Sequence, residues 1–301
     1  MRRLVKLYPF ILLMLCIGEI GYGQDIDKKL QLTLSAGPQK ENLHWSIAGN
    51  TSGQSPNVLS ELKWQNVKGT NYAAGLQATV WRNIIVLGGY NRVSVKSGNI
   101  SDIDYSADNR SQPTYNQNFS NNKGYTSAWY AGAGYIVFNN NKFSLVPSAG
   151  YSNNKQSLYI TDATGRFPDL NSFYNTQWKG AFIKVKSSVK IWRELKAVAD
   201  VTYNQVNYNA QGDWNLINEF MHPVSYSHVA KGYGINAGAN LAYNVTPNLG
   251  VSFGYTYFNW QTGNGTDQLY LSSGQVDKTQ LNGVYRNGHL FSGGIVLSLD
   301  K

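Results

Sequence analysis

The chain alternates apolar and polar residues along several long segments, and this period of two is the strongest pattern in its sequence. In residues 181–192, mostly apolar side chains at odd positions oppose Lys184, Lys186 and Lys190. The same alternation fills residues 72–80, 195–204, 233–244 and 249–257. Because an α-helix cannot place alternate residues on one side, these segments are predicted to be β-strands.

The connections between these strands alternate between short turns and long polar segments. Short turns are expected at residues 82–83, 139–142, 193–194 and 246–248, and long polar segments at about 49–57, 100–123, 161–175, 212–231 and 261–287. Such alternation is typical of a transmembrane β-barrel whose short turns face the periplasm. We therefore predict an all-β protein, namely a ten-stranded antiparallel transmembrane β-barrel with short periplasmic turns and long extracellular loops.

A soluble β-sandwich or lipocalin-like barrel would show similar alternation and is the alternative fold. Two features favour the membrane barrel. The alternating segments are about twice as long as soluble strands, which usually have about 5–6 residues, and their second face carries mid-strand Lys and Asn that a packed core would leave unpaired. Aromatic residues near strand ends are expected in interfacial girdles, as for Trp81, Trp192, Tyr243 and Trp260. Ten strands enclose a narrow lumen, so a general porin is not expected.

The N-terminus is typical of a secretory signal peptide. A basic start is followed by an apolar stretch at residues 9–18 and by small residues at Gly21 and Gly23. We predict removal of residues 1–23 before Gln24, which leaves one barrel domain at 24–301. A membrane anchor is the alternative, but the apolar run is shorter than the ~20 residues that a spanning helix needs.

Composition and charge narrow the environment of the protein. The only cysteine of the sequence, Cys16, lies in the predicted signal, so no disulfide or thiolate site is expected in the barrel. The chain carries a net charge of +9, with 14% charged and 13% aromatic residues. Export and a basic surface predict the cell outer membrane, with lipopolysaccharide phosphates as a partner. Nucleic acid is not expected, because the basic residues are spread through the strands rather than gathered in one patch.

Two acidic spots carry the candidate chemistry. Asp102 and Asp104 lie on the same side of an extended segment, where like charges repel and one carboxyl keeps its proton to higher pH. Such a pair can orient a water molecule or hold a cation. Asp213, in the run Asp213-Trp214-Asn215, follows another predicted strand at the same outer rim. The phosphate loop, HExxH and GxSxG signatures are absent from the sequence.

These residues and their spacing resemble the omptin family, ten-stranded outer-membrane endopeptidases whose active site is a groove at the extracellular mouth. The family has an Asp-x-Asp-aromatic motif after its third strand and an Asp-x-His motif after its seventh. The resemblance covers most of the chain after residue 23, with similar stretches at residues 37–41, 62–64, 96–105, 167–168 and 243–248.

The resemblance implies a role for each matching residue. Asp102 and Asp104 would orient the attacking water, and Asp213 would match the aspartate of the second motif. Asn215 stands at the position of the motif histidine, and an amide cannot take the proton that an imidazole takes.

The resemblance also implies a pocket for a basic side chain of the substrate. Glu41 matches one acid of this pocket, whereas Gln211 stands where the second acid is expected. An extracellular peptide or protein would then be the substrate, with lipopolysaccharide as an activating lipid and no other cofactor.

The sequence leaves three functions open. The first is an omptin-like endopeptidase that cleaves near basic residues, in which His222 or His228 from a long loop replaces the missing base. The second is a non-catalytic barrel whose loops bind surface glycan, lipopolysaccharide or a protein. The third is a site for a hard cation, built from the three aspartates, although no resident metal is predicted.

Overall fold

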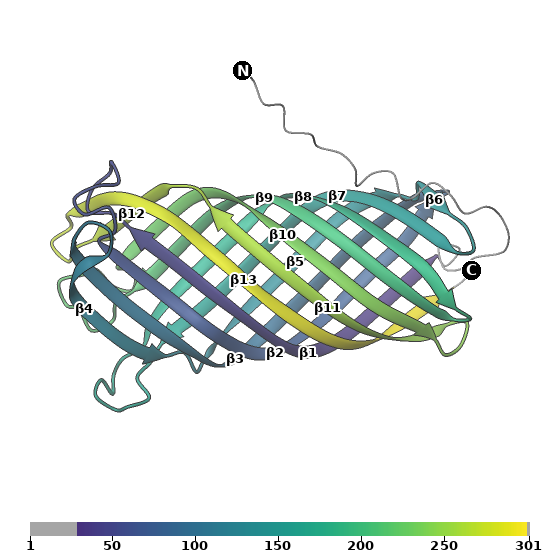
Figure 1. Ribbon diagram of the computed structural model, residues 1–301, viewed down its shortest axis with the longest axis horizontal. Helices are drawn as coiled ribbons and strands as arrows, with labels where there is room; N and C mark the ends of the chain where they lie inside the picture. The colour runs from purple at the N-terminus through teal and green to yellow at the C-terminus, as the bar shows by residue number, and fades with distance from the viewer. Residues whose placement is uncertain (1–28, 300–301) are drawn as a thin grey trace, which may run out of the picture.

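The computed structural model describes residues 29–299, which form one antiparallel sheet closed into a barrel (Figure 1). The first and last long strands pair from Leu30 with Leu299 to Ile47 with Leu281, and this pairing closes the ring. The ten long strands, in the order of their pairing, are β1 (Leu30–Ile47), β2 (Ser60–Trp81), β3 (Ile84–Ala107), β5 (Gly124–Tyr135), β7 (Phe143–Ile160), β8 (Ser172–Trp192), β9 (Leu195–Asp213), β10 (Tyr226–Asn244), β11 (Leu249–Thr262) and β13 (Val276–Leu299). The prediction of a ten-stranded antiparallel barrel is confirmed, and closure leaves no unpaired sheet edge in lipid.

Three shorter strands extend the ring at its ends. β4 (Ser111–Ser120) pairs with β3, and β12 (Gly265–Tyr270) pairs with β10 and β13, at the left end of Figure 1. β6 (Phe138–Asn139) pairs with β7 at the opposite end. Among the described residues no helix is long and apolar enough to cross a membrane. The predicted signal peptide lies outside the described residues.

The short turns gather at one end of the barrel, as predicted. β2 turns into β3 through residues 82–83, and β8 turns into β9 through residues 193–194. Arg82 and Arg193 adopt left-handed backbone angles there, with φ of 42° and 45°. Such angles let a two-residue turn follow the right-handed twist of the paired strands.

Two of the five long polar segments, 100–123 and 261–287, are mostly strand, which corrects the sequence prediction, whereas 49–57, 161–175 and 212–231 are mostly loop as predicted. β3 continues through residues 100–107 and turns back as β4, and β12 with β13 fills most of residues 261–287. In this half of the barrel the strands stay hydrogen-bonded to each other, but the polarity of their outer and inner faces is reversed. Polar side chains face outward and apolar ones inward, so a polar composition does not mark a loop here.

An apolar band surrounds the half of the barrel nearest the short turns. Ile183 on β8, for example, is 62% exposed on the outer wall. Exposed aromatic rings border the band on both sides, as expected at the two membrane interfaces. Trp81, Tyr135, Trp192 and Tyr243 form the lower girdle beside the turns, and Tyr90, Trp129, Tyr151, Tyr203 and Tyr233 form the upper girdle. The membrane-spanning segments lie between these girdles.

The upper half of the barrel is filled by a buried aromatic cluster. This cluster consists of Trp45, Trp64, Tyr174, Trp178, Tyr208, Tyr226 and Trp260. Trp260 is only 2% exposed, so its predicted place in an interfacial girdle is wrong, because its position on β11 turns the side chain inward. Its ring lies against Gly234 of the paired strand, where an added Cβ would come within 2.2 Å of a ring carbon.

A buried polar layer adjoins the aromatic cluster, and its Arg286 pairs in register with Trp260 of that cluster. The Glu41 carboxylate accepts hydrogen bonds from Arg286 at 2.8 Å, from Gln156 at 2.6 Å and from Gln39 at 2.9 Å. Asn71 donates to Gln39 at 3.1 Å. These five residues, called the Glu41 layer below, come from four strands and are all buried. The arginine and the amides satisfy the buried charge of Glu41, and together with the aromatic cluster they fill the lumen above the membrane-spanning part.

Candidate functional site

The first acidic pair lies on β3 above the upper girdle, outside the membrane-spanning segments. Asp102 follows buried Ile100 on the inner face of the strand and is only 8% exposed. Burial raises the pKa of Asp102 to about 7, and repulsion from the Asp104 carboxylate adds to this. Burial also raises the pKa of Asp104, against a hydrogen bond from Ser60 that lowers it. The pair therefore holds a proton at higher pH than isolated carboxyls do, as the spacing predicted.

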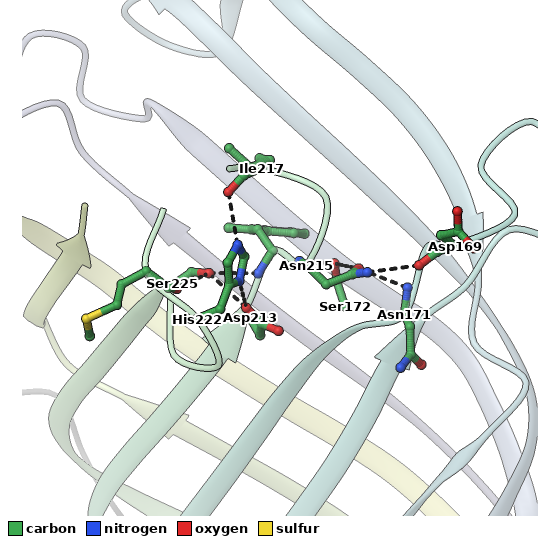
Figure 2. A network of polar contacts seen from close by, with 10 residues as sticks. Asp169, Asn171, Ser172, Asp213, Asn215, Ile217, His222 and Ser225 are labelled. Atoms are coloured by element: carbon green, nitrogen blue, oxygen red, sulfur yellow. Dashed lines mark hydrogen bonds and ion pairs between the residues drawn. The ribbon is translucent and has the colours of Figure 1, made fainter. Parts of the chain in front are cut away.

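The second acidic spot brings a histidine to Asp213. Asp213 ends β9, and its Oδ1 lies 2.6 Å from Nδ1 of His222 and accepts a hydrogen bond from Ser225 at 3.1 Å (Figure 2). Nε2 of His222 lies 3.2 Å from the carbonyl oxygen of Ile217. An imidazole therefore reaches the second-motif aspartate from the β9–β10 loop, although the motif position itself holds Asn215.

Asn215 connects two loops and does not face Asp213. Its Oδ1 accepts hydrogen bonds from the Asn171 backbone at 2.9 Å and from the Ser172 hydroxyl at 3.0 Å. Its Nδ2 donates to the Asp169 carbonyl at 2.8 Å (Figure 2). These three contacts fix the β9–β10 loop to the end of the β7–β8 loop, and this is a structural role.

A stack of aromatic rings fills the interior beside the rim aspartates. Trp214 stacks on Tyr226 with ring centroids 5.6 Å apart, Tyr226 stacks on Tyr174 at 5.8 Å, and Tyr174 stacks on Trp64 at 5.4 Å. The stack therefore crosses the barrel interior from the end of β9 to β2.

The three aspartates share one end of the barrel without forming one site. Burial raises the pKa of the Tyr226 phenol well above its usual range, and the nearby charges of Asp102, Asp267 and Asp213 contribute. Tyr226 is thus close to both acidic spots. Within residues 29–299, however, no group of three or more His, Cys, Asp or Glu side chains is placed to hold a metal ion.

The two residues assigned to a substrate pocket lie apart from the aspartates. Glu41 belongs to the Glu41 layer, where Arg286 already neutralises its charge. Gln211 is exposed on the outer face of β9, between the inward-facing Ala210 and Gly212. The structure therefore does not bring Glu41 and Gln211 together as a pocket for a basic side chain.

A buried polar chain that the sequence did not predict runs through the aromatic cluster. The Tyr174 hydroxyl lies 2.7 Å from the Tyr208 hydroxyl and 2.7 Å from Nδ1 of His228. Nε2 of His228 lies 3.1 Å from the Asp267 carboxylate, at an angle outside that of a hydrogen bond. His228 is fully buried and does not reach the rim aspartates. Only the alternation of Tyr226 with His228 on β10 signalled that this histidine faces inward.

A belt of basic side chains surrounds the outer wall just above the upper girdle. Its members alternate with more buried neighbours and therefore point outward: Lys40, Lys68, Arg92, Lys155, Lys179 and Lys231. They come from six of the ten long strands and are called the basic belt below. Lys179 and Lys231 also line a surface hollow of about 520 Å³, together with Asn207 and Asn209 of β9.

Glu61, an acid of β2 above this belt, is already paired. Glu61 on β2 is buried, with the Lys63 ammonium at 2.8 Å and the Arg110 guanidinium at 3.0 Å. Burial acts to raise the pKa of Glu61, but hydrogen bonds from His44, Lys63, Arg110 and Tyr105 outweigh it and hold the pKa well below its usual range. The potential of the outer wall at the belt is therefore positive.

The closed ring, the girdles and the basic belt define an outer-membrane β-barrel. The chain belongs to the Protochlamydia outer membrane protein family (Pom), whose family model matches residues 33–301. The protein thus resides in the cell outer membrane, as predicted.

The chain is similar to several solved structures, of which the first one below shares its fold. The outer membrane protease OmpT from Escherichia coli matches with a TM-score of 0.71 and 14% identity, over 90% of this chain and 96% of that chain. The translocator domain of autotransporter NalP from Neisseria meningitidis matches with a TM-score of 0.39 and 10% identity, over 88% of each chain. The outer membrane protein OprG from Pseudomonas aeruginosa matches with a TM-score of 0.37 and 8% identity, over 92% of this chain and 100% of that chain. No curated protein matches the sequence. The likeness to OmpT shows a common fold, and membership of the omptin family stays a prediction.

The raised pKa of Asp102 predicts a pH-dependent effect on stability. Because the folded-state pKa of about 7 lies above the usual Asp value of 3.8, the folded protein binds more protons than the unfolded chain between these pH values. Its stability should therefore fall as the pH rises from near 4 to near 7. Asp102→Asn removes the cost of ionising this buried carboxyl. It should raise the free energy of unfolding near pH 8 by ~1–4 kcal/mol, with little change near pH 4.

This prediction is checked by guanidinium unfolding of the detergent-refolded barrel at both pH values. Asp169→Asn, at an exposed loop position, serves as the control and should change neither value. Equal stabilities of Asp102→Asn and the parent protein near pH 8 would contradict the assignment of a buried, proton-holding carboxyl.

Proposed function

We propose that this barrel binds lipopolysaccharide through the basic belt and that its extracellular end is non-catalytic. The belt is the observation that carries this proposal. Anionic headgroups attract basic side chains at a membrane surface by about 1 kcal/mol for each Lys or Arg. The upper girdle fixes the level of the lipid headgroups, and the belt lies directly above it.

Lys179 and Lys231 of the belt line a surface hollow. Two ammonium groups flank it, and Asn207 and Asn209 supply amide donors and acceptors. Phosphate oxygens match the ammonium groups, and sugar hydroxyls match the amides. The phosphorylated sugars of lipopolysaccharide combine both chemistries, so this hollow supports them as the ligand.

The non-catalytic part of the proposal is supported by the state of the groups that peptide hydrolysis would need. Glu41 is bound to an internal arginine, and Asn215 holds two loops together. The stack from Trp214 to Trp64 fills the interior where the omptin resemblance implies a groove. A substrate carbonyl would have to displace several buried rings before it could reach Asp102.

A second function, endopeptidase activity, is favoured by one observation. The 2.6 Å contact between Asp213 and His222 is an aspartate–histidine pair of the kind that activates a nucleophilic water. If the loops open, His222 could replace the base that Asn215 cannot supply.

The lipopolysaccharide proposal predicts the effect of neutralising the hollow. Lys179→Gln combined with Lys231→Gln should weaken binding of purified lipopolysaccharide about 30-fold, because two headgroup contacts of about 1 kcal/mol each are lost. Titration of the refolded barrel, followed by tryptophan fluorescence at fixed ionic strength, measures this. Lys186→Gln combined with Lys190→Gln removes the same charge inside the lumen and should leave the affinity unchanged. If both double variants weakened lipopolysaccharide binding equally, the loss would follow from the net charge of the protein, and a site at the hollow would be refuted.

Peptide cleavage distinguishes the two functions. The non-catalytic proposal predicts no cleavage of peptides with paired basic residues by the barrel refolded with lipopolysaccharide, and no gain from Asn215→His, because that side chain points to the β7–β8 loop. Cleavage that is lost in both Asp102→Ala and His222→Ala would overturn the proposal and establish the endopeptidase. The exposed variant Asp169→Asn controls for the handling of the protein.

A further inference from the structure

A water-accessible cavity occupies the membrane-spanning half of the lumen. Its volume is about 430 Å³, within the usual range of small-molecule sites. Residues from all sides of the ring line it, including Thr33 of β1, Ser188 of β8 and Ser252 of β11. This cavity lies below the Glu41 layer and is separate from the rim aspartates and from the basic belt.

The charges in this cavity are strongly unbalanced. Five lysines line it, and Asp200 is the only acidic residue among its described lining residues. The lysines are Lys142, Lys184, Lys186, Lys190 and Lys196. Asp200 is bound to Lys184 at 3.2 Å. The contact of Lys190 with Glu194 is long, at 3.8 Å, and Glu194 does not line the cavity. A positive potential therefore remains inside walls of low dielectric constant, which strengthen it.

Neutral hydrogen-bonding groups complete the lining. Ser144 and Ser188 bring hydroxyl groups 2.6 Å apart on neighbouring strands. Asn240 and Asn244 line the side formed by β10. Hydroxyl and amide donors beside ammonium groups are the set that binds carboxylate and phosphate oxygens.

The cavity opens toward one end of the barrel only. The turn residues Asn139, Asn140 and Lys142 lie at its short-turn end. At the other end the Glu41 layer and buried Phe182 close the lumen. Short turns of outer-membrane barrels face the periplasm, so a solute would enter and leave from the periplasmic side.

We propose that this cavity is a binding site for a small, water-soluble oligoanion that carries two or more carboxylate or phosphate groups. The five lysines gather on one wall of the cavity, formed by β8, the paired start of β9 and the turn before β7. Several neighbouring ammonium groups suit a ligand with several anionic groups better than a single charge. A lipid headgroup is excluded as the occupant, because the barrel wall separates the cavity from the bilayer. The closed upper end makes the cavity a site of binding rather than a transport path, and the inference does not depend on the lipopolysaccharide proposal.

The proposal is tested with citrate and with inorganic pyrophosphate as probes, by calorimetric titration of the full refolded barrel at low ionic strength. Saturable binding is expected for at least one probe. Lys186→Gln combined with Lys190→Gln should weaken it about tenfold or more, because charge-assisted hydrogen bonds are lost. Asp200→Asn should strengthen it severalfold, because it removes a carboxylate of the lining that competes for Lys184.

The matched control is Lys96→Gln combined with Lys278→Gln, which removes the same charge from exposed strand positions outside the basic belt and should leave the affinity unchanged. Retained heat resistance and circular dichroism show that each variant is folded. Absence of saturable binding of both probes would overturn the proposal, as would equal weakening by the two double variants. A folded Asp200→Asn variant with unchanged affinity would also contradict it, even if the lysine variants fail to fold.

Discussion

The structure depends on one constraint: the outer face of each strand meets lipid along one part and water along another. The hydrogen bonds to the neighbouring strands continue along both parts and keep the ring closed. In lipid the outer face must be apolar, and above the membrane the same face meets water. β9 satisfies both conditions along one strand. Its outward side chains change from Val201 and Tyr203 to Asn207 and Asn209, while inward-facing Tyr208 joins the buried aromatic cluster. The inversion places a packed core in the upper half and a polar lumen in the lower half.

This inversion separates the chemistry of the two ends. The aromatic cluster and the Glu41 layer occupy the lumen between them, so groups at the rim and groups in the basic cavity cannot act on one ligand. The rim presents a raised-pKa carboxyl pair and an Asp213–His222 contact, which in the described residues do not combine into a metal site. Within residues 29–299, the lower lumen presents five lysines and one aspartate in a single cavity. The outer wall adds the basic belt, and each of these three places suits a different kind of ligand.

The sequence predicted the lower half of the barrel better than the upper half. Where lipid imposes apolar residues at every second position, as in residues 181–192, both the strand and its outward face could be derived. Above the membrane, frequent polar residues predict a loop, as at residues 100–107. The strand continues there, because its outward face meets water and is polar while its inward face is apolar. The raised pKa of Asp102 followed from local spacing. The pairing of Glu41 with Arg286, 245 residues apart in sequence, depends on ring closure, which no local pattern reveals.

The sealed lumen is the central claim, and side-specific labelling of single cysteines tests it most directly. Ser188→Cys places a thiol in the basic cavity, and Ser106→Cys places one at an exposed position near the extracellular end of β3. With the barrel oriented in vesicles, a membrane-impermeant maleimide should label Ser188→Cys only from the short-turn side and Ser106→Cys only from the opposite side. Labelling of Ser188→Cys from both sides would mean that the aromatic cluster and the Glu41 layer do not close the barrel.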